Sequence, residues 1–128
     1  MSRWPALVKT LKFKKSGQIN LNVDKSSKIA FLEISHPSRN IMTSSMQIEL
    51  RNKLDLVHQA SKNLHGVVLY GDPKNKAFCA GADLNEVKTL AEYFKESEEE
   101  TLPMFEFMQE TCDIFRSLLG KVINLVSN

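Results

Sequence analysis

The chain has 128 residues, of which 42% are hydrophobic and 25% are charged. These values are ordinary for one globular domain with a core of its own. Seventeen Lys and Arg against fifteen Asp and Glu give a net charge of +2, which is too balanced to indicate a nucleic-acid partner, and no apolar run is long enough to span a bilayer.

Residues 1–15 form a basic segment, which we separate from a domain covering residues 16–128. No acidic residue occurs before Asp24. Apolar residues of the segment fall on one helical face: Trp4, Leu7, Val8 and Leu11. This pattern predicts a short basic helix or tail. A mitochondrial transit peptide is the alternative, although such peptides are richer in Arg and Ser.

The first half of the domain begins with a predicted hairpin. Apolar and polar residues alternate at residues 19–23 and 29–34, and a short polar turn separates the two runs. A loop at residues 36–40 follows, because Pro37 and its short polar neighbours favour turns. Ser44 and Gln47 form a capping pair that predicts a helix running to about residue 62.

The second half alternates further strands and helices. The elements predicted are, in order, a buried strand at residues 67–70, a helix that Asp83 and Glu86 cap and that ends near Leu90, a solvated acidic loop at 92–101, a helix at 102–119 and a strand at 121–126. Strands interleaved with helices indicate an α/β domain. The two cysteines, Cys79 and Cys112, favour a reducing compartment and do not have metal-binding spacing.

The stretch Lys76–Leu84 carries the chemical signal. Gly81 permits a backbone angle that a Cβ would disfavour, and its alanine neighbours are too small to block a ligand. Asp83 then caps a helix, which leaves the backbone N–H of Ala82 at a helix N-terminus, where negative charge is favoured. An enolate oxygen is one such charge. The pattern alone also fits a tight turn that has no function.

Two blocks of sequence resemble the enoyl-CoA hydratase/isomerase (crotonase) superfamily. One is the stretch Lys76–Leu84 with the preceding Gly66–Gly71, and the other is Pro37–Asn40 followed by the capped helix. Both occur in order on the expected strand, loop and helix elements. Within the superfamily, the chain is most similar to ethylmalonyl-CoA decarboxylases, notably at Asp83–Leu90 and Phe107–Gln109. The resemblance implies a crotonase-like α/β fold of repeated strand-strand-helix units, truncated to its N-terminal part.

The resemblance also implies roles for particular residues. The N–H of Ala82 is expected to be one of two oxyanion donors. Contacts with coenzyme A are expected from Arg39 and Asn40 near the nucleotide end, and from Ala80, Gly81, Asp83 and Leu84 along the adenine and pantetheine path. The second donor and the acid/base carboxylates of relatives correspond to positions beyond Asn128. The chain by itself is therefore expected to be nearly inactive.

The implied activity is decarboxylation of ethylmalonyl-CoA or methylmalonyl-CoA, which is a carbon–carbon lyase reaction. An enoyl-CoA hydratase or isomerase of fatty-acid oxidation is one alternative, and a non-catalytic short isoform or fragment is another. The substrate is an acyl-CoA thioester, so coenzyme A is not a separate cofactor, and no metal is expected. Full-length relatives are trimers or hexamers. The expected compartment is the cytosol, with the mitochondrion as the alternative.

Overall fold

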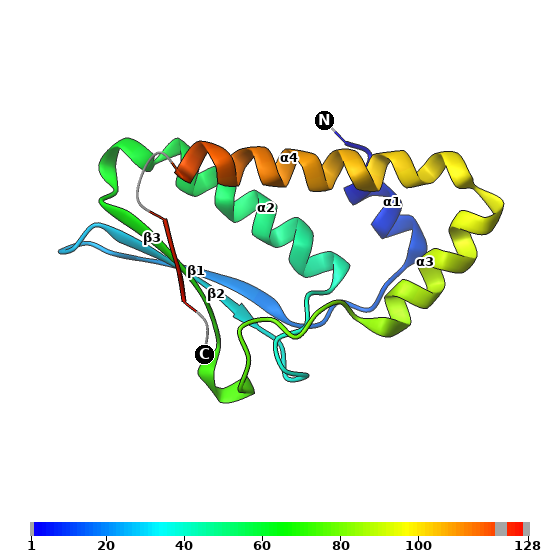
Figure 1. Cartoon of the computed structure of the whole chain (residues 1–128), viewed down its shortest axis with the longest axis horizontal. Helices are drawn as coiled ribbons and strands as arrows, with labels where there is room; N and C mark the ends of the chain where they lie inside the picture. Colours follow the sequence, from blue (N-terminus) through cyan, green and yellow to red (C-terminus); the bar gives the residue numbers. More distant parts are fainter. Residues whose placement is uncertain (1, 120–122, 127–128) are drawn as a thin grey trace.

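The computed structural model of the chain describes residues 2–119 and 123–126. It contains a four-stranded sheet with helices α2 and α4 running over one face (Figure 1). The elements are α1 (Trp4–Leu11), β1 (Gln18–Asp24), β2 (Ile29–Ser35), α2 (Ser44–Gln59), η1 (Ser61–Asn63), β3 (Gly66–Gly71), η2 (Pro73–Asn75), α3 (Leu84–Glu96), η3 (Glu98–Glu100), α4 (Thr101–Leu119) and β4 (Ile123–Val126).

The sheet has the strand order β1-β2-β3-β4. Strands β1 and β2 pair antiparallel as a hairpin, which confirms the predicted one. Strands β2, β3 and β4 are mutually parallel, so helices cross over between them. Because Ile34 pairs with Gly71 at the ends of β2 and β3, the loops that leave these two strands start side by side at the same edge of the sheet.

Two hydrophobic clusters hold the helices in place. In the main cluster, the apolar stripe predicted for α2 packs against the sheet and against Leu118 at the end of α4. The stripe consists of Met46, Leu50, Leu54 and Val57. A second cluster joins α1 to α4 through Trp4, Val8 and Phe107, with further apolar residues of α2 and α3 around it. The amphipathic helix predicted near the N-terminus is therefore formed, and it packs against α2 and α4.

The structure corrects two helix ends. Helix α3 continues to Glu96, six residues past the predicted end at Leu90. The prediction of a loop at residues 92–101 is wrong, because this stretch comprises the end of α3, the short helix η3 and the first residue of α4. The extension is stabilised by Phe94, which packs against the second cluster. Helix α2 begins at Ser44 as expected, but its N-cap is Thr43, whose hydroxyl accepts a hydrogen bond from Met46 N at 3.2 Å.

The loop after β2 is built around the buried side-chain amide of Asn40, which has no exposed surface. Its Oδ1 accepts hydrogen bonds from His36 N at 3.0 Å and Asn75 Nδ2 at 2.9 Å. Its Nδ2 donates to Asp72 O at 3.0 Å and Ala77 O at 2.7 Å. One side chain thus ties the loop after β2 to the loop after β3.

We predict that Asn40→Ala lowers the free energy of unfolding by about 3 kcal/mol, because it leaves several buried polar groups unpaired. Urea denaturation of the purified chain measures this change. The matched control is Asn22→Ala, since Asn22 lies exposed on the edge strand β1. Equal, small effects of the two substitutions would contradict the structural role assigned to Asn40.

Candidate functional site

Two loops that follow β2 and β3 pair with each other at the edge of the sheet. The N–H of Ala80 donates to the carbonyl of Arg39 at 3.2 Å. The N–H of Met42 donates to the carbonyl of Gly81 at 2.7 Å, and Met42 and Ala82 form a parallel bridge. The two sequence blocks that carry the family resemblance, which are far apart in the chain, therefore meet at one place.

Two glycines allow the second loop to take this path. A Cβ on Gly71 would lie 2.4 Å from the carbonyl oxygen of Ala77 and 2.5 Å from that of Phe78, so only glycine lets the loop return against the end of β3. Gly81 has a φ of +127°, which L-residues rarely adopt. This second feature confirms the prediction that Gly81 provides an unusual backbone angle.

The N–H of Ala82 lies directly before the first turn of α3. In the bridge between Ala82 and Met42, the hydrogen bond runs from the N–H of Met42 to the carbonyl of Gly81, so the N–H of Ala82 takes no part in it. No residue that the structure describes accepts a hydrogen bond from this N–H. Ala82 is exposed, so the donor is open to a ligand, as an oxyanion donor must be.

Asp83 is the N-cap of α3, as predicted. Its Oδ1 accepts hydrogen bonds from Asn85 N at 2.9 Å and Glu86 N at 3.4 Å. The carboxylate of Asp83 therefore occupies the end of the helix itself. This carboxylate does not bond the N–H of Ala82, which lies one residue before the cap.

Glu86 does not complete the predicted capping pair with Asp83. Its side chain is buried, and Oε1 accepts a hydrogen bond from the backbone N–H of Ser44 at 2.7 Å, which joins the start of α3 to the start of α2. Burial raises the pKa of the Glu86 carboxyl above its ordinary value, and the hydrogen bond from Ser44 opposes this shift. Sequence reasoning missed this role because the partner lies 42 residues away.

A cavity of about 200 Å³ lies beside these groups. The paired loops and the starts of α2 and α3 contribute Met42, Ser44, Ala82, Asp83 and Glu86 to its lining. Helices α1, α2, α3 and α4 contribute the remaining lining residues, which are mostly apolar: Trp4, Gln47, Val87, Leu90, Met104, Phe105 and Met108. Ala82, with its open N–H, and Glu86, with its buried carboxyl, thus both line a mostly apolar cavity.

The other predicted site residues lie outside this cavity. Arg39, Ala80 and Gly81 are exposed on the paired loops, and the side chain of Leu84 is 80% exposed. A ligand that lies on the paired loops can therefore reach these residues. The side chain of Asn40 does not make the predicted contact with coenzyme A, because it is fully buried and hydrogen-bonded within the protein.

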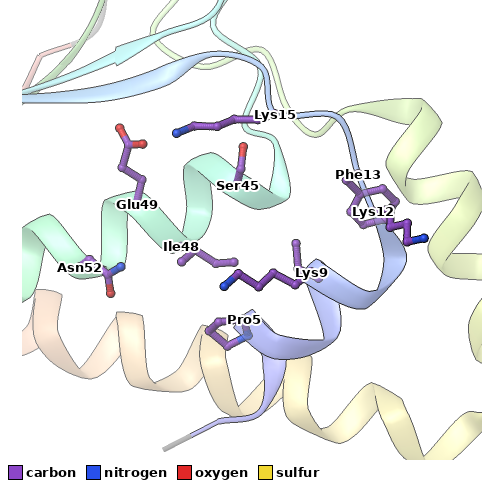
Figure 2. Close-up of a pocket in the computed structure, with 10 residues that line it drawn as sticks. Pro5, Lys9, Lys12, Phe13, Lys15, Ser45, Ile48, Glu49 and Asn52 are labelled. Atoms are coloured by element: carbon purple, nitrogen blue, oxygen red, sulfur yellow. The ribbon is translucent and has the colours of Figure 1, made fainter.

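A larger groove of about 630 Å³ runs between α1 and α2. Figure 2 shows Lys9 of α1 and Lys15 of the segment before β1 extending toward α2. Both lysines are exposed, so water solvates their charges, and the carboxylate of Glu49 also lines the groove. None of the predicted site residues lines this groove, whereas Ala82 and Asp83 line the smaller cavity.

Within residues 2–119 and 123–126, no three His, Cys, Asp or Glu side chains are grouped so that they could hold a metal ion. In the same part of the chain, every helix is too short or too polar to cross a bilayer.

Comparison with known proteins finds solved structures with the same fold and a relative with a similar sequence. No family model matches the chain. The structure aligns with a protein described as an enoyl-CoA hydratase/isomerase from Mycobacterium abscessus, at 18% identity and a TM-score of 0.68 over 86% of this chain and 40% of that one. It also aligns with an enoyl-CoA hydratase of Polaromonas sp. JS666, at 19% identity and a TM-score of 0.64 over 85% of this chain and 39% of that one.

The chain therefore has the crotonase-like α/β fold of the enoyl-CoA hydratase/isomerase superfamily, which the two sequence blocks predicted. In sequence it is 36% identical over 84 residues to the ethylmalonyl-CoA decarboxylase of Xenopus tropicalis. This match takes in 65% of the chain and 25% of that relative, so the chain spans about a quarter of the length of the relative.

The buried carboxyl of Glu86 predicts a specific dependence of stability on pH. Its ordinary pKa is 4.5 and its pKa in the folded chain is higher. Between these two values the folded state binds a proton that the unfolded state lacks, so the Glu86 contribution to stability decreases as the pH rises through this range. We expect the stability of the wild type relative to Glu86→Gln to fall as the pH rises above 4.5.

Urea denaturation of both proteins at a series of pH values measures this difference. A glutamine at position 86 retains an oxygen that can accept from Ser44 N, so the substitution removes chiefly the titrating group. Glu92→Gln, at an exposed position on the same helix, controls for the loss of one negative charge. A difference that stays constant or grows with pH would contradict the assignment.

Proposed function

We propose that the chain forms one side of an acyl-CoA site, in which the N–H of Ala82 stabilises the enolate that forms when ethylmalonyl-CoA or methylmalonyl-CoA loses CO₂. The observation that carries the proposal is the open N–H of Ala82, which the paired loops hold beside an apolar cavity. The similarity to ethylmalonyl-CoA decarboxylase supports this choice of reaction.

The chemistry requires little of the protein beyond this donor. When the bond between the α-carbon and the carboxylate carbon breaks, CO₂ leaves and the electron pair moves onto the thioester, where it forms an enolate. A backbone N–H aimed at the thioester oxygen lowers the energy of this charge. Decarboxylation does not require a base that removes a proton from carbon, and coenzyme A enters as part of the substrate.

The exposed residues of the paired loops are the proposed contacts with coenzyme A. Arg39, Ala80 and Leu84 border the open side of the loops, and the guanidinium of Arg39 suits phosphate groups. Gly81 and Asp83 are proposed to contribute through their backbone, because Gly81 has no side chain and the carboxylate of Asp83 already caps α3. The acyl group is proposed to lie in the cavity between α3 and α4.

The reaction is tested by offering the purified chain ethylmalonyl-CoA and crotonyl-CoA in parallel. We expect slow formation of butyryl-CoA from ethylmalonyl-CoA and no hydration of crotonyl-CoA, with products measured by mass spectrometry. The rate is expected to be slow because Ala82 is a single oxyanion donor, and the loss of one donor from a site costs about 10²–10³ in rate. Hydration of crotonyl-CoA would support the hydratase alternative, and no turnover of either thioester would support a non-catalytic role.

The donor itself is tested with Ala82→Pro, because proline has no N–H. We expect the carbonyl band of bound butyryl-CoA, labelled with ¹³C at the thioester carbon, to shift to lower wavenumber in the infrared spectrum of the wild type. The shift should be lost in Ala82→Pro and kept in Ala82→Gly, which retains the N–H. An unchanged band shift in Ala82→Pro would exclude Ala82 as the donor.

A further inference from the structure

The N-terminal helix contributes one residue to the cavity that holds the proposed site. Trp4 lines this cavity together with Ala82 and Glu86, and the other lining residues come from the loops after β2 and β3 and from α2, α3 and α4. Val8, one turn further along α1, lines the separate groove between α1 and α2. Among the residues that the structure describes, Trp4 is therefore the residue of α1 that lines the cavity.

Trp4 is held firmly in this position. Its side chain is 1% exposed and forms the second cluster with Val8 and Phe107. The hydroxyl of Ser2 accepts a hydrogen bond from Trp4 N at 3.1 Å and donates to the carbonyl of Pro103, which lies in the first turn of α4. The start of α1 is thus tied to the start of α4, so the indole forms a fixed wall of the cavity.

A hydrogen bond within the protein does not account for an indole at this position. The Nε1 of Trp4 is buried and has no hydrogen-bond partner in the described part of the chain, which ordinarily costs about 1–3 kcal/mol. A phenylalanine or leucine would fill an apolar cluster without this cost. What tryptophan adds is size, and its bulk limits the apolar cavity.

We propose that Trp4 is a specificity-determining residue, which limits the cavity to a short acyl group. The inference rests on the proposed acyl-CoA function. A cavity of about 200 Å³ is somewhat larger than a protein cavity of about 150 Å³ that binds benzene, so its size suits an acyl group of a few carbons. Met104 and Met108 of α4 form the adjoining wall, so a smaller residue at position 4 extends the cavity toward α1.

The test compares butyryl-CoA with octanoyl-CoA as ligands of the purified chain, with dissociation constants measured by calorimetry. We expect Trp4→Leu to improve the affinity for octanoyl-CoA relative to butyryl-CoA by at least tenfold over the wild type, because each methylene accommodated in an apolar pocket is worth about tenfold or more. Val8→Ala is the matched control. It removes side-chain bulk from the same helix and cluster but does not line the cavity, so it should leave the ratio unchanged.

Far-UV circular dichroism and urea denaturation establish that each variant is folded, and Trp4→Phe replaces Trp4→Leu in the same measurement if the latter does not fold. An unchanged ratio in the folded Trp4 variant, or an equal change in Val8→Ala, would overturn the inference and leave the proposed function intact. A wild type that binds neither thioester would overturn both.

Discussion

The site depends on the pairing of two loops at the carboxyl ends of the parallel strands β2 and β3. The register that places Ile34 opposite Gly71 brings both loops to the same edge of the sheet, and the hydrogen bond from Met42 N to Gly81 O joins them. Open α/β sheets commonly bind ligands beyond the carboxyl ends of their strands. Here that edge presents the N–H of Ala82, because the pairing uses the neighbouring carbonyl and leaves this donor open.

The pairing is supported from below and from the side by two buried polar groups. Asn40 joins the two loops beneath the surface through hydrogen bonds of its amide. Glu86 joins the starts of α2 and α3 through Ser44 N. Both side chains are poorly solvated, so leaving either of them or its hydrogen-bond partners unpaired would cost free energy of folding. The geometry around Ala82 is consequently set by interactions that do not touch a ligand.

The division of roles between Asp83 and Glu86 follows from their positions at the start of α3. The carboxylate of Asp83 reaches the N–H groups of its own first turn and begins the helix. Glu86, three residues later, points across to α2 and is largely buried. One acid therefore serves local structure, while the other connects two helices beside the cavity. Trp4 lines that cavity from α1, which lies in the segment that the sequence predicted to be a basic tail or helix.

The sequence by itself determined the features that depend on neighbouring residues. Alternation at residues 19–23 and 29–34 predicted the hairpin, the apolar stripe of α2 predicted its buried face, and Gly81 with Asp83 predicted an open N–H before a capped helix. Such features are local because periodicity and capping act over a few residues. The superfamily resemblance also depended on local motifs.

Only the tertiary structure decided how distant residues combine. The burial of Asn40, the bond from Ser44 to Glu86 and the place of Trp4 in the cavity wall each join segments that are far apart in the chain. The continuation of α3 to Glu96 has the same origin, because Phe94 packs against the cluster around α1, which lies far from it in the sequence. Packing of this kind overrides local propensity, since helical stability in proteins comes mainly from a buried apolar face.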